Sequence, residues 1–254
     1  ETEGTWEWSS DEGFAYKNWQ VGEPDGGISQ SYAMLMLGFK GYEQELTHTG
    51  KWADVQNSWS IGGGLDISKG IAEIKIIPDP IIRGDSIYSI VDGPSWTEAE
   101  ANSNKLGGHL VTINDQKEND FIEQITFDNS SQSSWIGLSD VDSDGTWEWS
   151  SNLKSDYTNW DATQNQPNGG SQLYAGIIAG SLNDKEKDDE GREAGSWHDY
   201  RLQNEPSKPQ IGISETPFIR RGDSAYVIVE GPTWEEAEAN ANKLGGHLVT
   251  INDA

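Results

Sequence analysis

The feature that most constrains how this chain can fold is an internal repeat. The nine-residue string GGHLVTIND occupies residues 107–115 and occurs again at 245–253. A second string, TWEWSS, occupies residues 5–10 and returns at 146–151. Both strings recur at nearly the same spacing, so the chain is built from copies of one unit that is long enough to be a domain.

The order of the repeated strings divides the chain into one whole unit and two partial ones. We expect residues 78–215 to form a complete domain, residues 1–77 to be the C-terminal half of a preceding copy, and residues 216–254 to be the N-terminal half of a third. A half domain by itself would expose strand edges and apolar faces. Further chain, or the complementary half of a neighbouring copy, is therefore expected to cover both partial units.

The first half of the complete unit predicts an alternation of strands and helices. Alternating residues at 86–91 predict a strand, and Ser95 with Glu98 form a capping box that starts a helix. A short buried strand at 110–113 follows, and then a second helix that opens at Asp115. The expected order is strand, helix, strand, helix.

The second half of the unit differs in composition and has no helical period. Beyond Ser133 the sequence is rich in Gly, Asn, Asp and Trp and has no helical period, which predicts strands and long loops. The last strand is expected at 210–213, and its equivalent in the first copy at 71–76. The predicted fold class is therefore α+β. Six repeated tryptophans are expected in the core rather than at a binding surface: Trp6, Trp8, Trp19, Trp147, Trp149 and Trp160.

Charge and composition exclude several kinds of partner. The 43 acidic and 17 basic residues give a net charge of -26, which disfavours nucleic acid and anionic membranes and favours cations. No apolar run approaches the ~20 residues that span a bilayer, so membrane insertion is not expected. The chain has no cysteine, so its domains must hold together by packing or by bound ions.

Three short motifs recur in the loop-rich halves or lie just before them. Residues 135–138 read WIGL; residues 23–25 and 166–168 read EPD and QPN, each after an Asn-Trp pair; residues 51–54 and 196–199 read KWAD and SWHD. In this order they resemble the WIGL, EPN or QPD, and WND motifs of the C-type lectin-like domain family. The particular resemblance is to cysteine-free bacterial versions, which occur in tandem in large extracellular repeat proteins.

This resemblance implies the C-type lectin fold and a calcium site in the long loop region. In the family, the first and third residues of EPN, a later glutamate and the last two residues of WND hold the ion, and sugar hydroxyls complete its coordination. The corresponding side chains are Glu23, Asp25, Gln30 and Asp54 in the first copy, and Gln166, Asn168, Gln172 and Asp199 in the complete copy.

The departures from the family motifs separate the two copies. Gln30 and Gln172 replace the later glutamate, and Ala53 and His198 replace the asparagine of WND. Each change removes a charge or an oxygen ligand, and calcium prefers several carboxylate and carbonyl oxygens. We therefore expect calcium in the first copy, and weak binding or none in the complete copy, which keeps only Asp199 as a charged ligand. EPD and QPN are hybrid motifs, so neither predicts a sugar.

A second acidic run lies before the TWEWSS string of the complete copy. Asp140 and Asp144 begin like an EF-hand loop, but Ser151 stands where that loop needs a bidentate acid. In the lectin family, acids four residues apart in this loop serve an accessory calcium site, which is the role the resemblance implies here. The alternative is an Asp-rich turn before a strand.

Two functions remain open at this point, and neither is catalytic, because no nucleophile, base and orienting acid recur together. The first is an extracellular, secreted or cell-surface module for calcium-assisted adhesion or binding to glycans or other surface ligands, within a large surface protein. The second is a structural subunit of an extracellular filament, in which neighbouring repeats or copies of the chain meet head to tail through complementary half domains.

Overall fold

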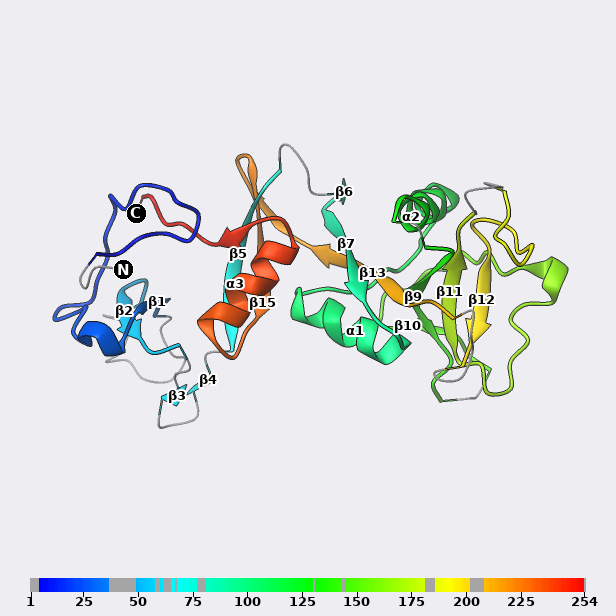
Figure 1. The fold of residues 1–254 in the computed structure, drawn as a ribbon, viewed down its shortest axis with the longest axis horizontal. Helices are drawn as coiled ribbons and strands as arrows, with labels where there is room; N and C mark the ends of the chain where they lie inside the picture. Colours follow the sequence, from blue (N-terminus) through cyan, green and yellow to red (C-terminus); the bar gives the residue numbers. More distant parts are fainter. Residues whose placement is uncertain are drawn as a thin grey trace. The chain divides into compact units, whose positions relative to one another are not determined.

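A computed structural model of the chain shows two compact units (Figure 1). Unit 2 is Pro80–Ile219, and unit 1 combines Glu1–Asp79 with Arg220–Ala254. The residues that the structure describes are 5–36, 49–57, 60–61, 65–66, 68–76, 81–129, 131–142, 145–180, 186–201 and 208–253. The unit boundaries lie at 79 and 219, where the sequence predicts 77 and 215.

An eight-stranded sheet runs through unit 2 in the order β12-β11-β9-β13-β7-β6, with β10 paired to β9 and β8 paired to β13. Its first long strand and its last pair antiparallel along their whole length, from Ser86↔Pro217 to Asp92↔Ile211. The strands are β6 (Ile81–Arg83), β7 (Ser86–Asp92), β8 (His109–Leu110), β9 (Ser133–Ser139), β10 (Glu148–Trp149), β11 (Tyr174–Ile178), β12 (Trp197–Tyr200) and β13 (Ile211–Pro217).

Two helices of unit 2 begin at the predicted caps. The hydroxyl of Ser95 accepts a hydrogen bond from the backbone N–H of Glu98 at the start of α1 (Trp96–Lys105). Asp115 caps α2 (Gln116–Asp128) in the same way. Both helix predictions are confirmed, because a side-chain oxygen at this position satisfies an N–H that the first turn leaves free.

Two strand predictions differ in extent from the structure. The strand expected at 110–113 is shorter in the structure, where β8 ends at Leu110. The N–H of Val111 makes the last backbone bond of this segment to β13, and the chain then turns toward α2. The strand expected at 210–213 continues to Pro217, because β13 follows β7 to its end. In both cases tertiary pairing, which the local pattern does not contain, sets the length.

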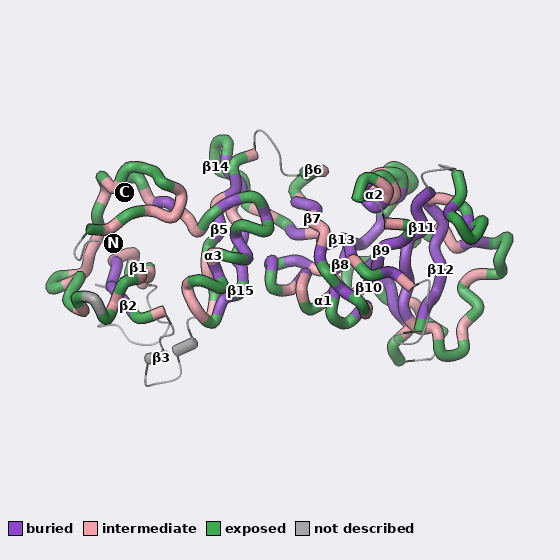
Figure 2. The backbone as a smooth tube through the Cα atoms, in the orientation of Figure 1, coloured by how far each residue is buried: buried purple, intermediate pink, exposed green. Residues whose placement is uncertain are grey.

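The core of unit 2 surrounds one tryptophan, Trp197, which is completely buried. The rings of Trp149, Tyr157 and Trp160 stand edge-on to it, with centroids 5.7 to 5.8 Å away. In unit 1, Trp52 occupies the same central place. Figure 2 shows the buried backbone concentrated on the strands of unit 2 and on the paired strands of unit 1. Of the six tryptophans predicted for the core, Trp149 is buried and the other five are half-buried around these clusters.

Unit 1 is built from both ends of the chain. Its main sheet has the order β14-β15-β5-β16, so β5 from the N-terminal segment lies between two strands of the C-terminal segment (Figure 1). The elements are η1 (Gly27–Ser29), β1 (Tyr32–Leu35), β2 (Trp52–Val55), β3 (Ser60–Ile61), β4 (Leu65–Asp66), β5 (Lys69–Lys75), β14 (Ile219–Arg221), β15 (Ser224–Glu230), α3 (Trp234–Lys243) and β16 (His247–Leu248).

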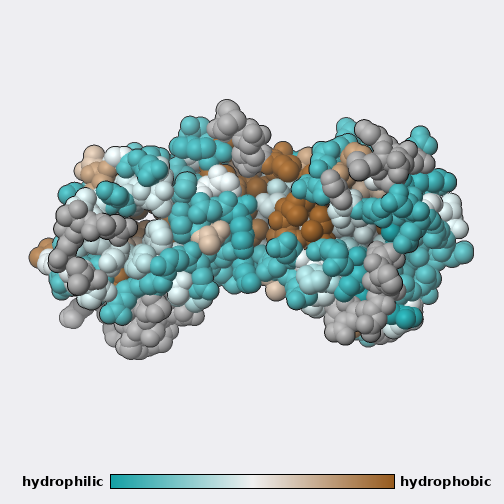
Figure 3. Space-filling view, viewed as in Figure 1, coloured by the Kyte–Doolittle hydropathy of each residue, from teal (hydrophilic) through white to brown (hydrophobic). Residues whose placement is uncertain are grey.

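The two terminal segments therefore cover each other. The sequence left open whether further chain or a neighbouring copy would do so, and in this structure the complementary half is the other end of the same chain. The visible surface is mostly hydrophilic, as the net charge of -26 leads one to expect (Figure 3). Within the described part of the chain, no helix has the length and apolar character to cross a membrane.

Candidate calcium site in unit 1

Three carboxylates of unit 1 converge at the loop that precedes β1. Glu23, Asp25 and Asp54 each place one oxygen within 4.8 Å of the other two. Glu23 and Asp25 flank Pro24 in the loop, whereas Asp54 lies on β2 and is almost completely buried. The pairing of β1 with β2 holds Asp54 opposite Ala33 and fixes it beneath the loop.

Asp54 fixes the loop as well as contributing charge. Its Oδ1 accepts the backbone N–H of Asp25, and its Oδ2 accepts the backbone N–H of Gly26, both at 3.0 Å. Two charge-assisted bonds to successive N–H groups restrain the loop backbone at the residue that carries the Asp25 carboxylate. The side chain of Gln30 lies directly over Gly26, where a β-carbon would overlap it. Gln30 therefore lies beside the cluster as well.

Burial and hydrogen bonding shift the pKa values of Glu23 and Asp54 in opposite directions. Burial raises the pKa of Glu23 to about 6, with further contributions from a hydrogen bond to Asp54 and from the charges of Asp25 and Asp54. Burial also opposes the ionisation of Asp54, but hydrogen bonds from Glu23 and from the N–H groups of Asp25 and Gly26 outweigh it and lower its pKa. At neutral pH Glu23 and Asp54 are mostly ionised, so the site attracts a cation.

The donor set fits calcium. All the converging atoms are carboxylate oxygens, which suit a hard cation in an irregular loop. One of them, Oε2 of Glu23, is buried and has no hydrogen-bond partner. A buried charged oxygen without a partner is costly, and a bound cation would satisfy it. Glu23, Asp25 and Asp54 are thus the side chains that could hold the ion, with the Gln30 amide nearby.

In the corresponding loop of unit 2, hydrogen bonds hold Oδ2 and the backbone oxygen of Asp199, whereas its Oδ1 is buried without a partner. Oδ2 of Asp199 accepts the backbone N–H of Gly169 at 2.7 Å. Gln172 donates from Nε2 to the backbone oxygen of Asp199, while Gln166 is half-buried and Asn168 exposed. Burial raises the pKa of Asp199, and the Gly169 N–H only partly offsets it. Among the described residues, those of unit 2 contain no group of three acidic or histidine side chains that converge.

A histidine–aspartate pair occupies the position next to Asp199. Nε2 of His198 lies 3.0 Å from Oδ2 of Asp161, and both side chains are buried. Asp161 also caps η3 (Ala162–Gln164) by accepting the N–H groups of Thr163 and Gln164. Burial lowers the pKa of His198, so at neutral pH the imidazole is uncharged and donates its Nε2 proton to the carboxylate.

Asp161 is the site residue that the sequence reading missed. Two sequence differences between the units could have indicated the pair. After the Asn-Trp pair, unit 2 has Asp161 where unit 1 has Gln20, and in the WND-like motif it has His198 where unit 1 has Ala53. The histidine thus replaces a calcium ligand of the family with a structural bond. For the predicted accessory site, Asp140 accepts the N–H of Gly145, and Asp144 lies outside the described residues.

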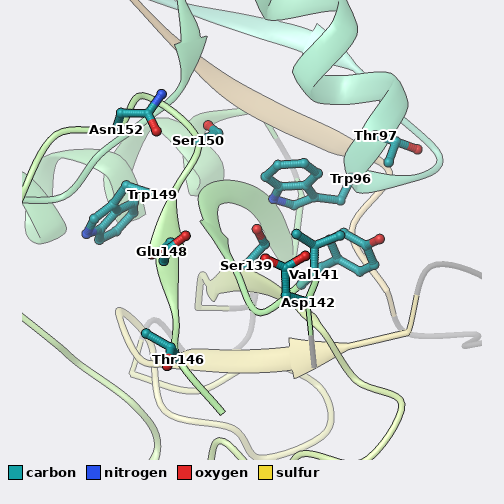
Figure 4. Close-up of a pocket in the computed structure, with 11 residues that line it drawn as sticks. Trp96, Thr97, Ser139, Val141, Asp142, Thr146, Glu148, Trp149, Ser150 and Asn152 are labelled. Atoms are coloured by element: carbon teal, nitrogen blue, oxygen red, sulfur yellow. The ribbon is translucent and has the colours of Figure 1, made fainter. Parts of the chain in front are cut away.

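A separate pocket of about 300 Å³ lies in unit 2 between α1 and β10 (Figure 4). Aromatic and hydroxyl side chains line it, including Trp96, Trp149, Ser139 and Ser150. The Trp96 indole donates to the backbone oxygen of Ile136 and is therefore fixed in place. None of the predicted ligand residues of the long loop lines this pocket.

The arrangement of these elements corresponds to a known family. Residues 92–200 match the profile of the lectin C-type domain. This segment of the chain belongs to the lectin C-type domain family. The family assignment and the α+β fold predicted from the sequence are confirmed.

Several known proteins are similar to this C-type lectin-like chain. Human C-type mannose receptor 2 is 28% identical over 62% of the chain, which spans 11% of that protein. A lectin of Pleurodeles waltl is 38% identical over 30% of the chain and 47% of its own length. Halomucin of Haloquadratum walsbyi is 31% identical over 62% of the chain and 2% of its own length. The chain thus spans less than half the length of each relative.

Solved structures also resemble it. The carbohydrate-recognition domain of cow CD23, determined in the presence of a GlcNAc2Man3 oligosaccharide, covers 54% of this chain and 92% of its own, with 23% identity and a TM-score of 0.42. Herring type II antifreeze protein covers 56% of this chain and 99% of its own, with 19% identity and a TM-score of 0.44.

Proposed function

We propose that this chain is an extracellular C-type lectin-like module that binds glycans with the help of a calcium ion held in unit 1. The observation that carries the proposal is the convergence of Glu23, Asp25 and Asp54, with the buried Oε2 of Glu23 unpartnered. The names of two similar proteins, a mannose receptor and a lectin, support glycans as the ligand class.

The acidic residues of unit 1 would have two roles, holding the ion and positioning the loop. Glu23, Asp25 and Asp54 would hold the ion, and Asp54 would keep the loop backbone in place through its bonds to Asp25 and Gly26. Calcium takes six to eight oxygen ligands, so a bound ion would offer positions for the hydroxyls of a sugar. Asp25 is exposed and lies at the mouth of the site, where a ligand would approach.

Unit 2 would contribute little to calcium binding. Asp199 is its one charged residue at the ligand positions inferred from the family, and it is buried with a raised pKa. The His198–Asp161 pair keeps this loop folded without an ion. We therefore assign calcium-assisted binding to unit 1, and a structural role to the same region of unit 2.

The surroundings in which such a module works are inferred from its chemistry. A net charge of -26 keeps a protein soluble and disfavours anionic partners. The similarity to halomucin, together with the tandem repeat and the lack of cysteine, supports a place in a large adhesive surface protein of a prokaryote, as the resemblance to bacterial repeat proteins suggested.

Calorimetry on the full chain tests this proposal. We expect a calcium site in unit 1 that is lost in Glu23→Gln and kept in the matched control Asp199→Asn in unit 2. Glu23 is the better residue to change, because Asp54 also holds the loop backbone through the N–H groups of Asp25 and Gly26. A glycan array, read with calcium and with a chelator, gives the ligand. A chain that is indifferent to calcium and has no glycan hits would rule the proposal out.

A second candidate function is structural. Its support is that unit 1 is assembled from two segments that the whole of unit 2 separates in sequence, and that unit 2 has lost most of its ligand residues. Such a chain could serve as a subunit of an extracellular filament in which complementary halves meet head to tail. Electron microscopy of the purified chain at high concentration would show filaments if this is correct, and only single particles if it is not.

A further inference from the structure

We propose that the two halves of unit 1 exchange between copies of this chain, so that residues 220–253 of one copy complete residues 5–76 of another. The proposal deepens the structural candidate, since it names the surface through which copies would join. It does not depend on filaments, because closed dimers formed by exchange would satisfy it equally.

The surface between the halves of unit 1 is extensive and specific. β5 pairs with β15 over seven residues, from Lys69↔Glu230 to Lys75↔Ser224, and its other edge pairs with β16. All the backbone bonds of β5 in this sheet are therefore made to the C-terminal segment. A strand that is held on both edges by another segment of chain can equally be held by the same segment from another copy.

A half-buried glutamate in each unit makes matching hydrogen bonds between the halves. In unit 1, Glu73 accepts hydrogen bonds from Ser224, Tyr226 and the backbone of Thr250. In unit 2, Glu215 accepts the equivalent three bonds, from Ser86, Tyr88 and the backbone of Thr112. Each glutamate comes from a C-terminal half, and its partners come from an N-terminal half.

In a second pair of glutamates the roles of the halves are reversed, because the acceptor lies in the N-terminal half and a donor in the C-terminal half. Glu238 lies in the N-terminal half and accepts bonds from the backbone of Leu248 and, across the boundary between the halves, from the hydroxyl of Ser9 at 3.1 Å. Glu100 of unit 2 accepts from Leu110 and, also at 3.1 Å, from Ser150. A neighbouring hydroxyl pair crosses both boundaries as well: Ser10 with Thr250, and Ser151 with Thr112.

The apolar packing between the halves is also the same in the two units. A β-carbon on Gly70 would lie 2.5 Å from Leu248 and 3.0 Å from Ala237. A β-carbon on Gly212 would lie at the same two distances from Leu110 and Ala99. Aromatic rings meet in the same way at the end of the boundary: Tyr32 with Trp234 at 5.2 Å, and Tyr174 with Trp96 at 5.3 Å.

These matches indicate that each half recognises its complement through contacts that the repeat reproduces. A trans pairing would make the same contacts as the cis pairing, so the balance between them depends on concentration and on the connection between the halves. In unit 2 the halves are continuous in sequence. In unit 1 they are connected only through Pro80–Ile219, which makes closure within one chain less favoured and exchange more accessible.

Engineered cysteines can detect the exchange, because the chain has none of its own. Ile71 and Ile228 face each other on β5 and β15, and both are exposed. Directly opposed residues of antiparallel strands have Cα atoms about 4.5 or 5.5 Å apart, within the range of a disulfide. One copy would carry Ile71→Cys and a second, of different mass, Ile228→Cys; the two would be mixed, unfolded, refolded together and oxidised.

Two controls check the strand pairing and the background of random crosslinks. The double variant with both cysteines in one chain should form an internal disulfide at low concentration, which checks the pairing itself. A mixture in which exposed Val141→Cys replaces Ile71→Cys measures disulfides formed by random collision. We expect the 71–228 crosslink between copies to exceed this background on the order of tenfold and to increase with protein concentration.

The possible outcomes distinguish the exchange of halves from the filament function. A 71–228 crosslink between copies at the level of the Val141 control, while the double variant closes internally, would overturn the exchange and confine the pairing to one chain. Failure of the double variant to close would overturn the surface itself. Crosslinked dimers without filaments would remove the filament function and leave the exchange standing.

Discussion

Asp54 and Asp199 occupy the same position of the repeat in opposite electrostatic surroundings. Asp54 accepts the backbone N–H groups of Asp25 and Gly26, and its pKa is lowered. Asp199 is buried with one short N–H bond, and its pKa is raised. One site is therefore prepared to keep its charge, whereas the other resists ionisation, although the two motifs differ by only a few residues.

The raised pKa of Glu23 predicts how calcium binding depends on pH. The carboxyl must lose its proton to bind the ion, so affinity should be constant above pH 7 and fall, by up to about tenfold per pH unit, as the pH drops through about 6. Calorimetry at pH 7.5 and at pH 5.0 measures this. An affinity that is the same at both values would show that Glu23 is not a ligand.

Stability without calcium should show the opposite trend. A carboxyl whose pKa is higher in the folded state than in the unfolded state binds more protons when folded, so stability falls as the pH rises from the ordinary glutamate value through about 6. Thermal unfolding of the chelated protein should show this fall. Glu23→Gln should remove it, and an unchanged pH profile in this variant would contradict the assignment.

The His198–Asp161 pair predicts a non-additive pair of substitutions. His198→Ala leaves a buried carboxylate without one of its partners and should lower the free energy of unfolding of unit 2 by about 1–3 kcal/mol. Combining it with Asp161→Gln reproduces the Gln20 and Ala53 of unit 1 and should restore part of the loss. Chemical denaturation of both variants measures the coupling, and purely additive effects would show that the two side chains are independent.

At the scale of elements, local signals and tertiary pairing explain different parts of the structure. The caps at Ser95 and Asp115 could be read from sequence because they depend on residues three positions apart. The length of β13 and the pairing of β5 with β15 could not, since both depend on partners far along the chain. The Glu23, Asp25 and Asp54 cluster was accessible only through motif order, and the Asp161 pairing with His198 was missed.

The glycine at the boundary between the halves gives an element-scale prediction. A β-carbon on Gly212 would overlap Leu110, so Gly212→Val forces β13 away from β8 and α1 and should cost about 1–3 kcal/mol of unfolding free energy. Gly13→Val is the matched control, because a side chain there meets no other atom within 4 Å. Equal unfolding midpoints for the two variants in denaturant would contradict close packing at this boundary.

At the scale of the whole molecule, one repeat sequence produces two units that differ in their loops. Unit 2 is continuous in sequence, whereas unit 1 joins the two ends of the chain and carries the acidic cluster. The same half-to-half surface therefore holds together a unit suited to structure and a unit suited to calcium.

A crystal structure of the full chain grown with calcium would test the central claim most directly. We predict one ion per chain, bound by Glu23, Asp25 and Asp54 in unit 1, and none beside Asp199 in unit 2. Crystals that show no ion at the unit 1 cluster at millimolar calcium, or an ion held at Asp199 instead, would contradict it.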